Sequence, residues 1–279
     1  MFTLRGLISA LVALLTIALA GAAAACGGEA SGADRVSVST ATATPGEPPP
    51  KLTLTATAVR QGGVLGMQVE GAGIAVDTIQ FGDRLLRLAP TPEGAWAAIG
   101  VAVDEPPGEY ALEVSVVGPD ARTHVLHAVV QVTPYDFPID AVDLAPDVAS
   151  LLDPSRVAEE ERILQRTLRG FSDAPAPPVR FQRPLAGEIT TTFGQARVYN
   201  GQEPAAADHH RGMDIGADEG TEVAAAAAGT VVLARELPIR GTYVMIDHGL
   251  GVFTGYGHLA EMRVREGDPV TAGQVIGLV

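Results

Sequence analysis

Histidine, the side chain most often used as a metal ligand, is concentrated in one part of the sequence. Four of the six histidines fall in the 50 residues from His209 to His258. The segment 209–214 reads His-His-Arg-Gly-Met-Asp and so combines imidazole groups with a carboxylate. Both are good donors to zinc, which makes His210 and Asp214 candidate metal ligands.

The spacing of this pair requires a bend in the chain. His210 and Asp214 are four residues apart, about 13 Å along a fully extended strand, which is too far for one ion to be shared easily. Gly212 lies midway and permits the bend. His209 could replace His210, but neighbouring strand residues point to opposite sides. Taken alone, the pair is a weak signal.

Further glycine-containing segments accompany this pair. They are IGADEGTEV at 215–223, GTVV at 229–232, GTYVMIDHG at 241–249, TGYGHL at 254–259 and VREGDPVTAGQVIG at 264–277, with PLAG at 184–187, TFG at 192–194 and Arg197 upstream. As an ordered set they closely resemble the LytM/lysostaphin-type zinc metallopeptidases, which cut the peptide cross-links of peptidoglycan. The resemblance covers residues 181–279.

The resemblance implies a site and a fold. His210 and Asp214 match two ligands of a catalytic Zn²⁺, and His258 matches the catalytic histidine beside the metal. His248 matches a position that is more often structural, Tyr256 a packing position, and His209 has no role. The implied domain, 181–279, is an antiparallel β peptidase domain of the barrel-sandwich hybrid type with a duplicated hybrid motif.

One part of the family pattern is missing. The third ligand and a second catalytic histidine belong to an HxH segment after GQxIG, but no histidine follows His258 and the sequence stops at Val279. A catalytic zinc site needs three protein ligands and an open position. We therefore expect the third ligand beyond Val279, in a longer enzyme of which this chain is an incomplete and inactive part. The alternative is a shortened, inactive relative.

The N-terminal residues predict export. Arg5 precedes an apolar run over 7–25, as in a secretory signal peptide covering 1–25. Cys26 is the sole cysteine, which rules out an intramolecular disulfide, and Ala-Ala-Ala before it resembles a bacterial lipobox with alanine where leucine is usual. The resemblance implies lipidation of Cys26 and a membrane-anchored envelope lipoprotein. An uncleaved anchor and plain secretion are alternatives, and each places the following residues outside the cytoplasm.

The middle of the chain predicts a linker and a β-domain. Residues 26–50, rich in Gly, Ser, Thr and Pro, are typical of a flexible tether. Alternating apolar residues over 52–58 and 110–116, a turn at 118–120 and a strand over 125–132 predict a small β-sandwich over 51–134. The predicted sandwich weakly resembles bacterial immunoglobulin-like modules. His124 and His127, in its last strand, carry no predicted chemistry.

A helix is predicted between the two β-domains. Asp153 is a good N-cap, Pro154 suits the first helical position and Gly170 ends the helix. Val157, Leu164 and Leu168 would share its apolar face. Residues 135–180 are therefore predicted to be a short helical connector and linker, and the whole chain to be mainly β.

Composition and charge argue against two classes of function. A net charge of −14 argues against nucleic-acid binding. The segment 264–277 also resembles biotinyl and lipoyl carriers, but these need a lysine, and Lys51 is the only one. We expect an exported zinc metalloendopeptidase acting on stem or cross-bridge peptides of peptidoglycan. The alternatives are an inactive LytM-like module that binds or activates another wall hydrolase, and a purely structural β-protein.

Overall fold

The computed structural model describes residues 36–38, 49–86, 89–91, 94–119, 121–142, 153–170, 172, 181–199 and 208–279. The chain divides into two compact units, Leu19–Asp136 and a second that includes Phe137–Val279. The predicted signal peptide and Cys26 lie outside the described residues. Among the described residues, no helix has both the length and the apolar character needed to cross a bilayer.

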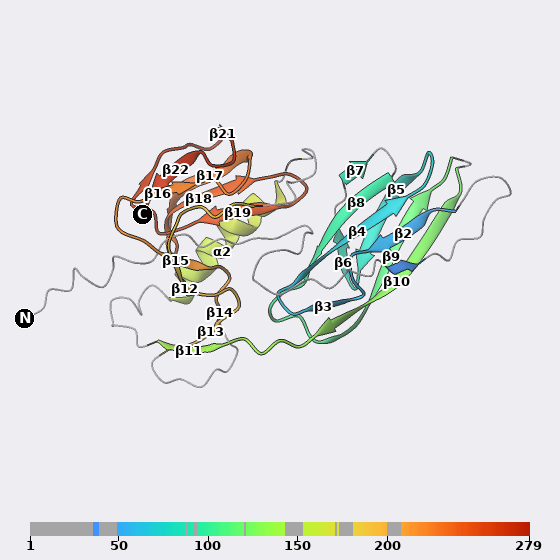
Figure 1. The fold of residues 1–279 in the computed structure, drawn as a ribbon, viewed down its shortest axis with the longest axis horizontal. Helices are drawn as coiled ribbons and strands as arrows, with labels where there is room; N and C mark the ends of the chain where they lie inside the picture. Colours follow the sequence, from blue (N-terminus) through green and yellow to red (C-terminus); the bar gives the residue numbers. More distant parts are fainter. Residues whose placement is uncertain are drawn as a thin grey trace, which may run out of the picture. The chain divides into compact units, whose positions relative to one another are not determined.

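The N-terminal unit contains two five-stranded sheets, seen at the blue-to-green end of the chain (Figure 1). The first has the order β1-β2-β4-β8-β7. Its strands are β1 Val36–Val38, β2 Lys51–Leu54, β4 Val64–Glu70, β7 Ala89–Thr91 and β8 Gly94–Gly100. The second has the order β3-β10-β9-β5-β6. Its strands are β3 Ala58–Arg60, β5 Ala75–Phe81, β6 Arg84–Leu86, β9 Gly108–Val117 and β10 Thr123–Thr133.

The two sheets share one hydrophobic core, as a β-sandwich does. Alternate residues of β9 are buried in it, among them Leu112, Val114 and Val116, as the period of two predicts. The single strand expected over 52–58 is wrong. β2 ends at Leu54 and β3 begins at Ala58 in the other sheet, so the chain changes sheets between them. The immunoglobulin-like assignment stays a prediction.

Besides one helix, the C-terminal unit contains strands arranged in four small sheets, coloured from yellow-green at β11 to red at the C-terminal end in Figure 1. Their orders are β11-β13-β14, β12-β15, β16-β22-β20 and β19-β18-β17-β21. The strands are β11 Ile139–Val142, β12 Glu188–Thr191, β13 Ala196–Tyr199, β14 Asp208–His209, β15 Asp214–Gly216, β16 Glu222–Ala224, β17 Gly229–Leu237, β18 Gly241–Asp247, β19 Phe253–Tyr256, β20 Glu261–Met262, β21 Pro269–Val270 and β22 Val275–Leu278.

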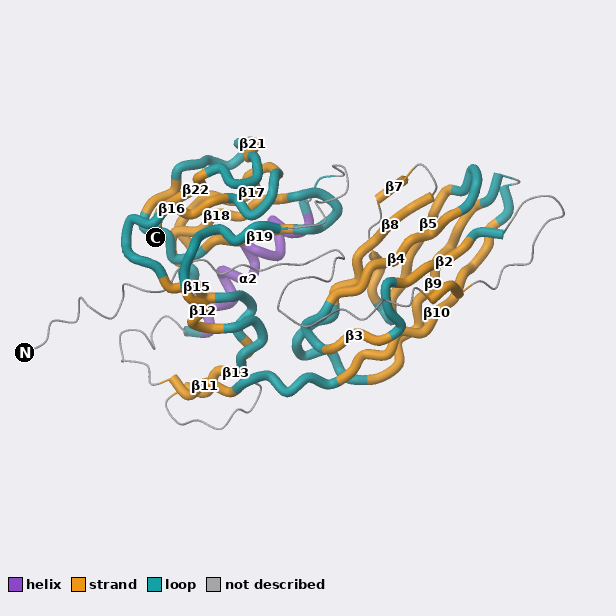
Figure 2. The backbone as a smooth tube through the Cα atoms, viewed as in Figure 1, coloured by secondary structure: helices purple, strands orange, loops and turns teal. Residues whose placement is uncertain are grey.

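The pairing within these sheets is antiparallel apart from β11 with β13, which is parallel. Figure 2 shows the same chain coloured by type of structure, with strands predominating. The mainly β fold class is therefore confirmed.

Helix α2, Pro154–Arg169, packs against β17 within this unit. The Asp153 side chain accepts a hydrogen bond from the Ser155 backbone, and Gly170 follows the last turn, so the predicted caps are confirmed. Leu164 is buried in a core cluster with residues of β17, β18 and β19. Val157 is 46% exposed, so its predicted place on the packed face is wrong. The residues at the start of the helix, 154–159, are exposed, and the first buried position is Glu160.

Candidate metal centre

A bend between two small sheets brings His210 and Asp214 together. The His210 N–H donates to the Gln195 carbonyl, and its own carbonyl accepts from the Gly194 N–H, which fixes it beside β13. Asp214 begins β15 and pairs with Thr191 of β12, in a different sheet. The backbone bends at Gly212, as its position predicted. His210 Nε2 lies 3.2 Å from Asp214 Oδ1, and both side chains are almost fully buried.

The His210 ring is oriented for ligation through Nε2. Its Nδ1 lies 3.3 Å from the Thr192 carbonyl oxygen, a contact that requires the proton on Nδ1. The neutral ring therefore presents a lone pair at Nε2. This buried atom has no hydrogen-bond partner, because the contact with Asp214 does not have hydrogen-bond geometry. A lone pair facing a carboxylate needs a cation or a proton between them, so the pair fits a metal ion such as zinc.

Asp214 is held in its ionised form. Burial by itself raises the pKa of this carboxyl group. A proton on His210 Nε2, which occupies the place a metal ion would take between the two groups, and the positive charge of Arg197 outweigh that effect, and the pKa of Asp214 lies below its ordinary value. Arg197 NH2 donates to Asp214 Oδ2 at 3.1 Å. One carboxylate oxygen thus faces Arg197 and the other faces His210, which favours the charged form that metal ligation requires.

His258 follows β19 in an uncommon backbone conformation. Its φ is 57°, in the left-handed region that residues other than glycine rarely adopt. The residue is exposed, yet desolvation of the ring lowers the pKa of His258, while the charge of Asp214 acts in the opposite direction. The imidazole is therefore biased toward its neutral form, which can accept a proton.

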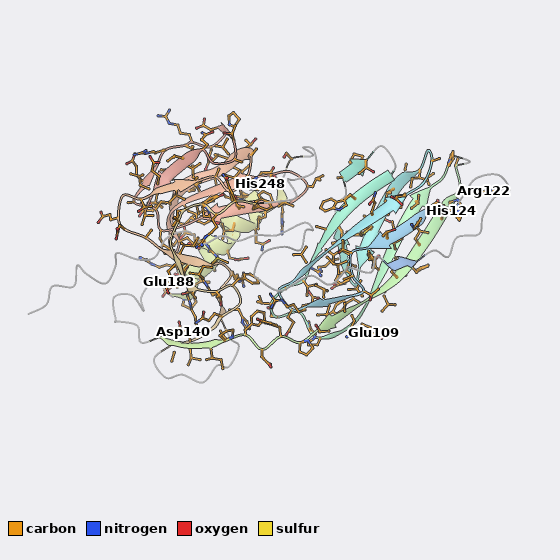
Figure 3. The ribbon with its side chains drawn as sticks, viewed as in Figure 1. Glu109, Arg122, His124, Asp140, Glu188 and His248 are labelled. Carbon is orange, nitrogen blue, oxygen red and sulfur yellow. The ribbon has the colours of Figure 1, made fainter. Side chains whose placement is uncertain are left out.

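His248 belongs to a buried hydrogen-bond chain. The Tyr256 hydroxyl accepts from the Ala226 N–H at 2.8 Å and contacts Thr254 Oγ1 at 2.9 Å. Thr254 Oγ1 lies 2.8 Å from His248 Nε2, and His248 Nδ1 lies 2.7 Å from the Ala228 carbonyl oxygen. The Ala228 carbonyl can only accept, so His248 Nδ1 carries a proton. If the Tyr256 hydroxyl donates to Thr254 Oγ1 and the Thr254 hydroxyl donates to His248 Nε2, each hydroxyl donates once and His248 is neutral. Figure 3 labels His248 in this unit, and its saturated surroundings fit a structural role.

The contacts of His209 are with residues other than the candidate ligands. Its Nδ1 is 2.8 Å from the Gly194 carbonyl oxygen, and its ring packs edge-on against Phe137 at 5.2 Å between centroids. These contacts attach β14 to the turn before β13. Nothing here gives His209 a chemical role.

Sequence reasoning missed one residue near these groups, Glu160. This carboxylate on α2 is 1% exposed. Its four-residue spacing from the buried Leu164 was the one available signal, because residues four apart share a helix face. In the described part of the chain, no cluster of three or more His, Cys, Asp or Glu side chains is arranged to hold a metal. His210 and Asp214 therefore supply two donors, and the roles assigned to them and to His258 stay predictions.

Part of the C-terminal unit is similar in sequence to known proteins. Residues 208–279 match the family model of Peptidase family M23. A 69-residue segment is 42% identical to the peptidoglycan DD-endopeptidase ShyA of Vibrio cholerae, and a segment of equal length is 48% identical to the murein hydrolase activator EnvC of Escherichia coli. Each match covers 25% of this chain but 16% of the relative.

A solved structure has a similar fold. It is described as a peptidase M23 from Pseudomonas aeruginosa, with a TM-score of 0.54 and 23% sequence identity. The alignment covers 78% of this chain and 81% of the other. At this level of identity the likeness concerns the fold alone.

Proposed function

Because residues 208–279 form a domain of Peptidase family M23, we propose that the protein is an exported zinc metalloendopeptidase that hydrolyses peptide cross-links of peptidoglycan. The name of one relative, a peptidoglycan DD-endopeptidase, supports this substrate class. The acidic chain, with a net charge of −14, is a poor ligand for nucleic acid.

The observation that carries the proposal is the His210–Asp214 contact. A buried imidazole nitrogen with no hydrogen-bond partner lies 3.2 Å from a buried carboxylate oxygen. Either a proton or a metal ion must lie between these two atoms, and the proposal assigns a metal ion to this place. Two converging donors with defined second partners, the Thr192 carbonyl and Arg197, have the composition of a zinc ligand pair with its outer contacts.

In this proposal His210 Nε2 and Asp214 Oδ1 hold the metal. A bound zinc ion supplies Lewis-acid chemistry, which polarises a peptide carbonyl and lowers the pKa of a water molecule toward about 7. Arg197 keeps the Asp214 carboxylate oriented and charged. His258, biased toward the neutral imidazole, accepts a proton or donates a hydrogen bond at the scissile group.

The test uses the full-length gene product, purified with its native metal. We expect it to contain zinc and to release cross-link fragments from purified peptidoglycan, identified by mass spectrometry. His210→Ala should lose both the zinc and the hydrolysis. His127→Ala is the matched control, because His127 is an exposed histidine of the N-terminal unit. A His210→Ala protein that hydrolyses peptidoglycan as well as wild type would refute the proposal.

The 48% identity to a murein hydrolase activator supports a second candidate, a module that binds and activates another wall hydrolase. An activator has no need of zinc ligands, and His210 and Asp214 are both present. The two functions separate in one assay, in which the protein is mixed with a wall amidase. An activator stimulates the amidase equally well with His210→Ala, and it leaves peptidoglycan intact when it is alone.

A further inference from the structure

A buried carboxylate that the proposed reaction does not use lies on helix α2. Glu160 is 1% exposed, although glutamate is almost never fully buried unless it is paired. It precedes Leu164 by one helical turn, and Leu164 packs in a cluster with Leu237 and Tyr243. This packing turns the Glu160 side chain toward the connection between β17 and β18.

Glu160 binds that connection through both of its oxygens. Oε2 accepts hydrogen bonds from the backbone N–H groups of Ile239 and Arg240, at 2.6 and 3.0 Å. Oε1 is paired with the Arg240 guanidinium group. Three donors from two consecutive residues thus converge on one carboxylate, and these charge-assisted bonds are stronger than neutral ones.

The same turn holds the backbone of His258. The Arg240 carbonyl accepts the His258 N–H at 2.8 Å, and the Thr242 carbonyl accepts the Leu259 N–H at 3.1 Å. A Cβ atom built on Gly241 would lie 3.8 Å from His258 Nδ1, so the turn also lies directly beside the imidazole. His258 has a left-handed φ, a conformation that costs free energy and persists where the surroundings enforce it.

We propose that Glu160 is a positioning residue for His258. Its carboxylate fixes the Ile239–Arg240 turn, the turn fixes the His258 backbone, and the imidazole is thereby held in place beside the turn. The inference rests on the proposed function only in giving His258 a part in the reaction. The competing explanation is that Glu160 merely attaches α2 to the sheet, in which case its loss would not reach His258 selectively.

Native-state hydrogen exchange on the full-length protein tests the connection without any activity. We expect the amides of Ile239, Arg240 and His258 to open together, with equal protection, in the wild-type protein. Glu160→Gln should speed exchange at all three, because the amide places a donor where a carboxylate oxygen accepted. Glu159→Gln, an exposed neighbour on the same helix, is the matched control. Unchanged His258 exchange in Glu160→Gln, or a wild-type His258 amide that opens separately from the turn, would overturn the proposal.

Kinetics on a soluble cross-linked muropeptide provide the second test. Glu160→Gln should lower kcat about 10- to 100-fold, the range expected for small misplacement of a reacting group, with KM changed by less than about twofold. Zinc content should stay at the wild-type level, since the hydrogen bonds of the Glu160 carboxylate go to Ile239 and Arg240. An unchanged kcat, or a loss that parallels loss of zinc, would contradict the positioning role. Absence of hydrolysis by the wild-type protein would instead contradict the proposed function, and the exchange experiment would still decide the role of Glu160.

Discussion

At the level of single residues, hydrogen-bond accounting separates the histidines that resemble each other in the sequence. His210 has one ring nitrogen bonded and the other buried without a hydrogen-bond partner. His248 has both ring nitrogens bonded, to a carbonyl and a hydroxyl. The first arrangement leaves a lone pair for an external ligand, whereas the second uses every polar atom internally. The difference supports a metal-binding role for His210 and a structural one for His248.

The buried His248 predicts a pH dependence of stability. Burial lowers the pKa of His248 below the ordinary value of 6.5, so the folded state resists protonation. Above that value both states are neutral and the group has no effect. As the pH falls through 6.5 toward the folded-state pKa, the unfolded chain takes up a proton first, and the free energy of unfolding decreases.

Denaturant unfolding between pH 7.5 and pH 5 would measure this decrease. The slope of the free energy of unfolding against pH should be smaller in His248→Gln, whose glutamine cannot be protonated, than in the wild-type protein. His127→Gln, at an exposed strand position, is the control for replacing a histidine by glutamine. Equal slopes in the wild-type protein and His248→Gln would show that His248 does not contribute to the pH dependence of stability.

At the level of elements, features set by neighbouring residues could be predicted from the sequence, whereas contacts between distant residues could not. The ends of α2 follow from Asp153 and Gly170, because capping involves residues within one turn of the helix end. The bend at Gly212 likewise follows from its neighbours in sequence. The Glu160–Arg240 pair joins residues 80 positions apart, and nothing in the sequence around either one specifies the other. The exposure of Val157 has the same origin, since only the fold shows where the apolar cluster ends.

The packed face of α2 can be tested by two alanine substitutions. Leu164→Ala removes a buried side chain that is 7% exposed and should lower the free energy of unfolding by about 2–5 kcal/mol. Val157→Ala, on the same helix but 46% exposed, should change it by less than about 0.5 kcal/mol. Thermal or denaturant unfolding provides the comparison. Similar effects of the two substitutions would contradict the observed orientation of the helix.

At the level of the whole molecule, the two compact units have separate cores and different chemistry. The N-terminal unit has one sandwich core, and the proposed site lies entirely within residues of the other unit. The family match also covers only the second unit, over 208–279. The mainly β class could be predicted because both units alternate apolar residues between glycine-rich turns. The pairing of short strands into four small sheets could not, because their register depends on contacts between distant segments.

The proposed lipid anchor gives a prediction for the intact protein. In cells, Cys26→Ser should move the protein from the membrane fraction to the soluble extracytoplasmic fraction or leave its leader uncleaved, because the thiol is the attachment point in a lipobox. Mass spectrometry of the wild-type N-terminal peptide should find a lipid on Cys26. An unmodified Cys26 in a wild-type protein that stays membrane-bound would support the uncleaved anchor instead.

The left-handed backbone of His258 has a consequence for how this domain can change over generations. A side chain other than glycine in that conformation costs about 1 kcal/mol or more. His258→Gly would remove this cost and, under the proposed function, the proton acceptor as well. Selection for thermal stability alone would therefore favour inactive variants over active ones. Stability and hydrolysis are opposed at this position, which gives one simple route from a wall-cutting enzyme to a folded protein that only binds.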